Sequence, residues 1–186
     1  MGGVRRVPNP DAAKGLKELI ALGNRKGKIG WFETAKYPDG TPVAYVAMIQ
    51  EMGSPKNSIP PRPFFRPTIE AQSGVWKSQF RSGAKAILAG NETAASVMEK
   101  VTSKAAGDVR RTITKITQPD LSPVTLLLRK WKQGDRGVKK ITGRMVGWAA
   151  AELNNGPVDL SGVSTKPLVD TGYMLETLTH KVEDSH

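Results

Sequence analysis

Two long apolar stripes, separated by one tight turn, constrain the fold of this chain more than any other feature. Between residues 65 and 88, apolar side chains recur at multiples of three or four positions, which is the spacing of an amphipathic helix. Residues 92–116 carry a second such stripe, and Gly90-Asn91 combines a helix stop with an N-cap residue. The sequence therefore predicts an antiparallel helical hairpin, with the aromatic side chains of the first stripe in its core.

Shorter elements are expected before the hairpin. Residues 11–22 carry one apolar stripe and predict a short helix, and residues 28–32 favour a strand. A further helix is expected to begin at Thr41-Pro42, because Thr suits the N-cap and Pro the first helical position, and to end at Gly53. The residues expected to share one face of this helix are Ala44, Ala47, Met48 and Glu51.

More short elements are expected after the hairpin. Ser122-Pro123 predicts a helix start by the same pairing of N-cap and first helical residue. Residues 144–153 favour another helix, with Trp148 pointing inward. Residues 177–184 carry alternating apolar and polar side chains, which is typical of a strand.

These elements define the expected class and organisation. The predicted class is α+β, with a small antiparallel sheet packed against the long helical hairpin and additional short helices. We expect a single domain over residues 1–186. Residues 133–165 are expected to be irregular and partly helical, and the family resemblance described below implies that they are an insert within this domain.

Charge is high and unevenly distributed along the 186 residues. The formal net charge is +11. Of the 28 Lys and Arg residues, 26 lie before residue 151, whereas six of the 17 Asp and Glu residues lie after residue 150. This asymmetry predicts either a polyanionic partner or self-association between oppositely charged surfaces. The alternative is a solvated surface that happens to be basic.

Cysteine is absent from the chain. Its absence excludes disulfides, thiolate metal sites and cysteine catalysis, and it agrees with synthesis in the cytosol. No apolar run approaches the ~18 residues that a membrane span needs. The opening residues lack the apolar region of a secretion signal, so no membrane partner is expected.

The triplet Asp170-Thr171-Gly172 raises the question of an aspartic protease. Such an enzyme needs two carboxylates that share a proton, and the further strands that enclose a peptide. Only 16 residues follow Asp170, which is enough for one turn and one strand. We therefore expect a structural turn in which Asp170 caps a short helix over residues 171–175.

Other signals of catalysis or cofactor binding are weak. The sequence carries neither a Gly-x-Ser-x-Gly elbow nor a Gly-x-x-x-x-Gly-Lys phosphate loop. His180 and His186 lie near the end of the chain without matching carboxylates, which makes a poor metal site. The expectation is a protein that is not an enzyme and that uses no metal and no cofactor.

Clusters of basic residues give some support to nucleic-acid binding. They are scattered over several elements, and no recognition helix or stacking pattern accompanies them. Sequence-specific recognition is therefore not expected, and a basic accessory protein that binds DNA without sequence preference is the alternative function. The candidates for contact with a DNA backbone are Arg110, Arg111, Arg129, Lys130 and Lys132.

Two stretches taken together resemble one protein family. "VAYVAMIQEMGSPKNSIPPRPFFRPTIE", residues 43–70, and "LSPVTLLLRKW" with "KPLVDTGYMLETLTHKV", residues 121–131 and 166–182, are similar to the tail-completion proteins of long-tailed bacteriophages. These are neck, or head–tail connector, proteins. The resemblance covers roughly residues 28–131 and 166–183, and the insert over residues 133–165 departs from it.

The resemblance implies a structural virion protein. Such a subunit assembles in the host cytoplasm into a ring, expected to be a hexamer, between the portal or head-closure assembly and the tail tube. Its partners would be copies of itself and the neighbouring neck and tail-tube proteins, and DNA would pass through the channel without specific binding. Its location would be the neck of the virion.

The proline-rich stretch around Arg62 is the candidate interface under this resemblance. Five prolines within residues 54–67 make the segment stiff, which lowers the entropic cost of docking. Arg62 can pair with a neighbour's carboxylate, and Phe64 or Phe65 can serve as an aromatic anchor. Alternatively, Arg62-Pro63-Phe64 plugs the start of the long helix inside its own subunit. The full set of interface candidates is Glu51, Gly53, Arg62, Pro63, Phe64 and Phe65.

Overall fold

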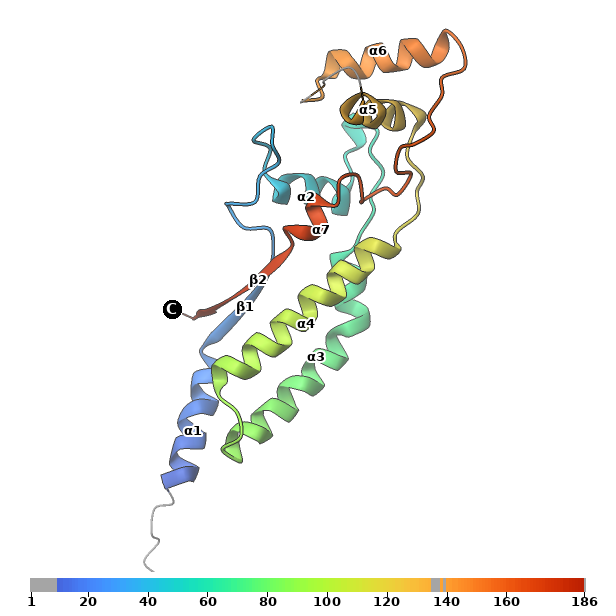
Figure 1. Ribbon diagram of the computed structural model, residues 1–186. Coiled ribbons are helices and arrows are strands. Elements are labelled where there is room, and N and C mark those ends of the chain that lie inside the picture. Colours follow the sequence, from blue (N-terminus) through green and yellow to red (C-terminus); the bar gives the residue numbers. More distant parts are fainter. Residues whose placement is uncertain (1–9, 135–137, 139, 186) are drawn as a thin grey trace, which may run out of the picture. The chain divides into compact units, whose positions relative to one another are not determined.

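A computed structural model describes residues 10–134, 138 and 140–185 of the chain. Seven α-helices and one two-stranded antiparallel sheet make up this part, which confirms the α+β class (Figure 1). The chain divides into two compact units. The hairpin unit comprises Met1–Gly30, Pro67–Val109 and Thr179–His186, and the elbow unit comprises Trp31–Arg66 and Arg110–Leu178. The expectation of one domain stays a prediction.

The hairpin unit contains most of the two long helices. They are α3, Phe65–Leu88, and α4, Ala94–Lys115, and they confirm the predicted hairpin. The turn differs in detail, because Asn91 is not the N-cap of α4. Thr93 takes that place, and its Oγ1 accepts a hydrogen bond from the Ser96 N–H at 3.2 Å.

The hairpin is held together by a polar link and by close packing between α3 and α4. Trp76 Nε1 donates a hydrogen bond to Asp108 Oδ2 at 2.9 Å. Gly83 packs so closely on α4 that a Cβ at this position would lie 2.4 Å from Cγ1 of Val97. The inner face of α4, which includes Val101 and Ala105, is buried.

A short helix and the sheet complete the hairpin unit. Helix α1, Pro10–Gly23, agrees with the predicted helix, and Glu18 on it accepts a hydrogen bond from the Ala94 N–H at 2.9 Å. Strand β1, Arg25–Gly30, pairs antiparallel with β2, Thr179–Asp184.

The sheet lies directly on the hairpin, as predicted. A Cβ on Gly27 of β1 would lie 2.3 Å from Oγ1 of Thr102 on α4. The first strand begins three residues earlier than expected and excludes Trp31 and Phe32. Trp31 is buried in the elbow unit, where its Nε1 donates to the Met174 carbonyl at 2.8 Å, so tertiary packing ends the strand.

The elbow unit contains short helices and irregular segments. Helix α2, Val43–Met52, begins one residue later than predicted, because Pro42 is extended and caps without a side-chain hydrogen bond. The remaining helices are α5, Pro123–Gln133, α6, Gly143–Asn154, and α7, Tyr173–Glu176.

The predicted start of α5 is confirmed, whereas two of the four residues expected to share one face of α2 are buried and two are exposed. Ser122 accepts a hydrogen bond from the Thr125 N–H at 3.2 Å, so it is the N-cap of α5. In α2, Val43 occupies the buried face with Ala47 and Glu51, whereas Met48 is exposed.

Helix α6 lies within the predicted insert and packs against α5 through a small apolar cluster. Ala149 of α6 is fully buried against Leu127 and Trp131 of α5. The expectation that Trp148 points inward is wrong, since 59% of this residue is exposed. Adjacent helical positions lie about 100° apart, so burying Ala149 turns its neighbour outward. Residues 135–137 and 139 of the insert lie outside the described part of the chain.

None of the helices in the described ranges combines the length and apolarity that crossing a bilayer requires.

The contact between α3 and α4 generates a first prediction. Gly83→Ala is expected to lower the free energy of unfolding by about 1–3 kcal/mol, because the new methyl group overlaps Val97. Gly74→Ala is the matched control: it lies on the same helix with nothing within 4 Å of the added Cβ, and it is expected to stabilise by about 0.5–1 kcal/mol. Urea unfolding measures both. Equal effects of the two substitutions would contradict the close packing.

Candidate functional site

A buried carboxylate joins α2 to the start of α3 in the elbow unit. Glu51, in the last turn of α2, accepts hydrogen bonds from the N–H groups of Phe64 at 2.6 Å and Phe65 at 2.9 Å. The Arg66 N–H donates to it at 3.2 Å and the Arg66 guanidinium at 3.1 Å. These N–H groups open α3 and have no partner within the helix. Glu51 therefore caps a helix that begins 14 residues later in the chain.

The turn between α2 and α3 requires glycine at its first position. Gly53 has φ 76° and ends α2, as predicted. A Cβ there would lie 2.9 Å from the Pro61 nitrogen and 3.0 Å from the Ile59 carbonyl oxygen. Any other residue would be strained and would collide with the segment that returns toward α3.

Arg62 and Phe64 are buried within the elbow unit. Arg62 donates from Nε to the Pro119 carbonyl at 2.9 Å and from Nη2 to the Asp120 carbonyl at 3.0 Å. Phe64 is fully buried and packs edge-on against Trp31, with ring centroids 5.9 Å apart. The internal plug, one of the two alternatives from the sequence, therefore describes these two residues.

The other interface candidates differ in exposure. Pro63 is exposed, Phe65 and Gly53 are half-buried and Glu51 is buried. The interface candidates thus share one elbow in the structure, but most of their polar atoms bind within it. We call this elbow, residues 51–66, the proline elbow.

Asp170 does not cap α7. The N-cap residue is Gly172, and the Tyr173 N–H lies 3.4 Å from the hydroxyl of Thr171. Asp170 instead lies 3.6 Å from Arg129 Nε and 3.6 Å from Lys132 Nζ, both on α5. The cap prediction is wrong because two cations compete for the carboxylate, and pairing with them is not the proton-sharing arrangement of a protease dyad.

Arg129 fixes the irregular segment that precedes the Asp-Thr-Gly turn. Its guanidinium donates to the carbonyls of Ser164 at 2.7 Å, Lys166 at 2.9 Å and Pro167 at 3.0 Å. The residue is buried, and burial lowers the pKa of its guanidinium while Asp170 opposes the shift. Arg129 is thus buried, and its guanidinium is occupied by carbonyls of its own chain.

The remaining candidates for DNA contact are also largely occupied. Arg110 donates to the carbonyls of Leu175 at 3.1 Å and Leu178 at 2.6 Å. Lys130 pairs with Asp159 at 2.7 Å, and Lys132 lies beside Asp170. Arg111 is exposed on α4. Arg110, Arg129, Lys130 and Lys132 thus have partners within the chain.

Several acidic residues near the end of the chain also have basic partners within it. Asp159 and Asp170 pair with α5, as described above. Glu183 pairs with Lys28 at 2.5 Å, and Asp184 lies 3.7 Å from Arg25 across the sheet. Four of the six acidic residues after residue 150 thus lie beside basic residues of the same chain.

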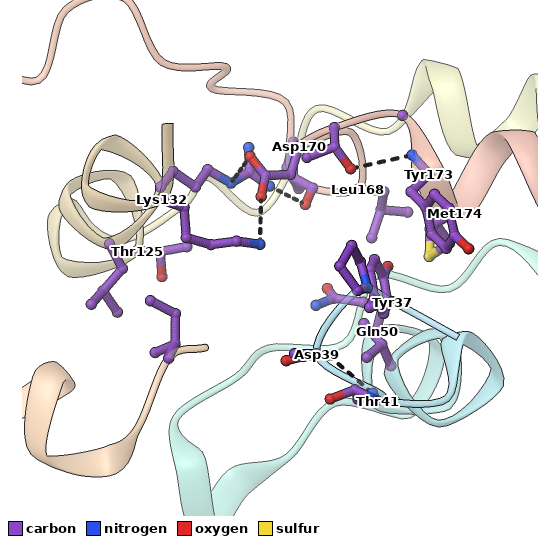
Figure 2. A pocket seen from close by; sticks show the side chains of 18 residues that line it. Tyr37, Asp39, Thr41, Gln50, Thr125, Lys132, Leu168, Asp170, Tyr173 and Met174 are labelled. Carbon is purple, nitrogen blue, oxygen red and sulfur yellow. Dashed lines mark hydrogen bonds and ion pairs between the residues drawn. The ribbon is translucent and has the colours of Figure 1, made fainter. Parts of the chain in front are cut away.

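A cavity of about 670 Å³ opens in the elbow unit beside the Asp-Thr-Gly turn (Figure 2). Helix α5 supplies one side, and α2 with the turn at residues 37–41 supplies the other. The apolar part of its wall includes Val46, Leu128, Ile141, Leu168 and Met174.

Polar and charged side chains also line this cavity. They are Tyr37, Asp39, Lys132, Asp170 and Tyr173. Burial raises the pKa of Tyr37, and the carboxylates of Asp170 and Asp39 raise it further. The Tyr37 and Tyr173 rings lie 5.3 Å apart between centroids. The Oδ1 atom of Asp170 is buried and accepts no hydrogen bond from the described residues.

Two turns that line this cavity can be predicted from the sequence, but their proximity in space cannot. The Pro-Asp-Gly turn at residues 38–40 and the Asp-Thr-Gly turn at residues 170–172 were each visible as turns. No local signal indicates that they line one cavity, because 129 residues separate them.

Two rows of large apolar side chains remain exposed on helices. The α2 row consists of Tyr45, Met48 and Met52, each more than half exposed. The α1 row consists of Leu16 and Ile20, which are also more than half exposed. The first row lies in the elbow unit and the second in the hairpin unit.

Histidine forms no metal centre in the described ranges. His180 Nε2 lies 2.6 Å from Glu99 Oε1, between β2 and α4. No group of three or more His, Asp or Glu residues is arranged to hold a metal ion among the residues that the structure describes. His186 lies outside them.

Comparison with known proteins identifies no relative of this chain. No protein family, no curated protein and no solved structure matches it. The resemblance to tail-completion proteins therefore stays a prediction from the residues.

Glu51 generates a prediction about pH. Burial alone would raise the pKa of Glu51, but hydrogen bonds from Phe64, Phe65 and Arg66 outweigh it and hold the pKa below its ordinary 4.5. A lowered pKa gives stabilisation that is present above pH ~4.5 and lost as the pH falls through the folded-state value. Glu51→Gln is expected to lower the free energy of unfolding by about 1–3 kcal/mol at pH 7, and the loss should shrink toward pH 3.

Urea unfolding at stepped pH values checks this expectation. Glu70→Gln on the exposed face of α3 is the control, with an expected change within about 0.5 kcal/mol. A difference between wild type and Glu51→Gln that stays constant from pH 7 to pH 3 would show that the carboxylate charge plays no part.

Arg129 generates a second prediction from this site. Arg129→Lys is expected to destabilise by about 1–3 kcal/mol, because one ammonium group cannot reach the carbonyls of Ser164, Lys166 and Pro167 together. Arg81→Lys, on an exposed turn of α3, should change stability by less than about 0.5 kcal/mol. Thermal unfolding compares the two variants. An unchanged melting temperature of Arg129→Lys would contradict a stabilising role of the three hydrogen bonds from the guanidinium to these carbonyls.

Proposed function

We propose that this chain is a structural virion protein of the phage neck. Its copies form a ring, in our proposal a hexamer, between the portal or head-closure assembly and the tail tube, and DNA passes through the channel without specific binding. The resemblance in residues 43–70 and 166–182 suggests this role. The structural observation that carries the proposal is the presence of separate exposed apolar rows on α1 and α2.

Exposed apolar rows on well-formed helices are typical of protein interfaces. Scattered apolar side chains are normal on a surface, whereas grouped ones indicate a contact site. Tyr45, Met48 and Met52 follow helical spacing, so they form one stripe opposite the buried face of α2. Tyr and Met are also enriched at interfaces, because they combine large contact area with adaptable shape.

Two different rows fit a ring better than a simple dimer. A twofold dimer uses one patch twice, whereas a closed ring of identical subunits joins one patch to a different one on the next copy. The α1 row and the α2 row differ in size and composition and lie in different units. They are candidates for the two sides of such a head-to-tail contact.

The internal bonding of the proline elbow supports the same role. Glu51 accepts a hydrogen bond from the Phe64 N–H within the elbow, and Arg62 donates to the Pro119 carbonyl of the same chain. A segment that is already ordered loses little conformational entropy when it docks. The elbow would thus present a rigid outer face, including Pro63, to a neighbouring ring.

The mass of the protein in solution and in particles tests the proposal. We expect the chain in purified virions of a phage whose genome encodes it, in a copy number that fits one ring. Sedimentation of the purified chain should show concentration-dependent assembly, or assembly once a neighbouring ring is added. A chain that stays monomeric under both conditions and is absent from virions would overturn the proposal.

One substitution tests the α2 row directly. Met48→Glu places a charge in the proposed contact and is expected to weaken self-association at least tenfold, without loss of secondary structure. Ile69→Glu on α3 is the control, because Ile69 has similar exposure and lies outside both rows. Sedimentation velocity and circular dichroism measure the two effects. Equal weakening by both variants would argue against a specific role of α2.

A further inference from the structure

The cavity beside the Asp-Thr-Gly turn holds an acceptor that lacks a donor. Oδ1 of Asp170 is buried and receives no hydrogen bond from the described residues, while Arg129 Nε lies 3.6 Å away. A buried carboxylate oxygen without a donor costs free energy. Water in the cavity or a group from a partner chain would supply the missing donor.

The shape and wall of the cavity suit a short peptide segment. Its volume of about 670 Å³ lies within the range of ligand sites. The apolar wall can cover aliphatic side chains, and the Tyr37 and Tyr173 rings line the cavity near the carboxylates. Aromatic faces beside carboxylates favour a guanidinium, which stacks on the ring and donates in its plane.

Four charged residues line the cavity, two of each sign. Arg129 is buried and held by three carbonyls, so it cannot turn toward a ligand. Lys132 is more exposed, and its Nζ lies 3.6 Å from Asp170 Oδ2, which is long for an ion pair. Asp39 lies across the cavity, where its Oδ1 accepts a hydrogen bond from the Thr41 N–H at 3.0 Å. An entering cation could therefore displace Lys132 and meet both carboxylates.

We propose that this cavity binds the N-terminal segment of a second copy of the chain, with Arg5 or Arg6 directed at Asp170 and Asp39. The proposal rests on the self-association in the proposed function. The segment, "MGGVRRVPN", lies outside the described residues, and its sequence places two arginines among Val4, Val7 and Pro8. Its composition, basic and aliphatic, is complementary to the carboxylates and the apolar wall.

The other basic clusters are less available for this contact. Arg25 and Lys28 face Asp184 and Glu183 across the sheet, and the α5 cluster faces Asp159 and Asp170.

Peptide binding tests the recognition itself. A fluorescent peptide of residues 1–9 is titrated into the full chain carrying Arg5→Ala and Arg6→Ala, so that its own segment does not compete. We expect saturable binding that weakens at least tenfold when both peptide arginines are replaced by alanine. Asp39→Asn in the protein should weaken binding severalfold, and it keeps the oxygen that accepts from Thr41.

Lys132→Ala gives the sharpest discrimination between ligand classes. It removes a competing cation, so binding of the arginine peptide should tighten severalfold. An anionic ligand site would respond in the opposite sense. Absent binding, equal binding of the alanine peptide, or weaker binding to Lys132→Ala would each overturn the proposal.

A covalent trap distinguishes a second copy from the same chain. Because the chain contains no cysteine, a tagged Arg5→Cys protein can be mixed with a Thr41→Cys protein under mild oxidation. We expect a mixed disulfide dimer, and Asn57→Cys, exposed outside the cavity, should give much less of it. Equal yields would refute docking in the cavity. If the chain binds the peptide but is absent from virions, the proposed ring function is contradicted, whereas the proposed peptide site in the cavity is not.

Discussion

The elbow unit depends on one carboxylate placed at the start of a long helix. Helix α3 opens after a segment with four prolines, which offers few N–H donors and no regular ladder. Glu51 supplies acceptors for three backbone N–H groups at once, and the partial positive charge of the helix start favours its negative charge. The hairpin unit repeats the device, because Glu18 of α1 accepts from the first residue of α4. Each long helix is thus capped by a glutamate from an earlier short helix.

Buried arginines perform the complementary task for irregular backbone. Carbonyl groups outside helices and strands need donors, and a guanidinium carries five N–H groups in a fixed plane. Arg62 holds the carbonyls of Pro119 and Asp120, and Arg129 holds three carbonyls before the Asp-Thr-Gly turn. Both arginines therefore stabilise irregular segments of the backbone. Because their guanidinium groups are occupied in this way, these two residues are unavailable for contact with a polyanion.

Local features of the sequence predicted local structure well. The hairpin stripes, the Ser122 cap and the Gly53 stop each depend on residues within a few positions, and the structure confirms them. Features that depend on distant partners were missed. No local pattern indicates that Glu51 caps α3 or that Asp170 lies beside α5, because these contacts join segments 13 to 41 positions apart. The prediction for Trp148 was wrong for another reason. In a short helix, amphipathic spacing defines the rotation of the helix about its axis only to within one residue.

Charge compensation inside the subunit changes what the net charge of +11 can mean. In the sequence, the basic body and the acidic end resemble two surfaces that attract each other between copies. In the structure, Glu183 and Asp184 lie opposite Lys28 and Arg25 in the same sheet, so this attraction acts within one chain. Contacts between copies would then depend on apolar area, which salt screens little, and on placed ion pairs such as an arginine in the cavity. For a ring through which a polyanion passes, such contacts have a physical advantage, because DNA competes for exposed cations but not for apolar rows.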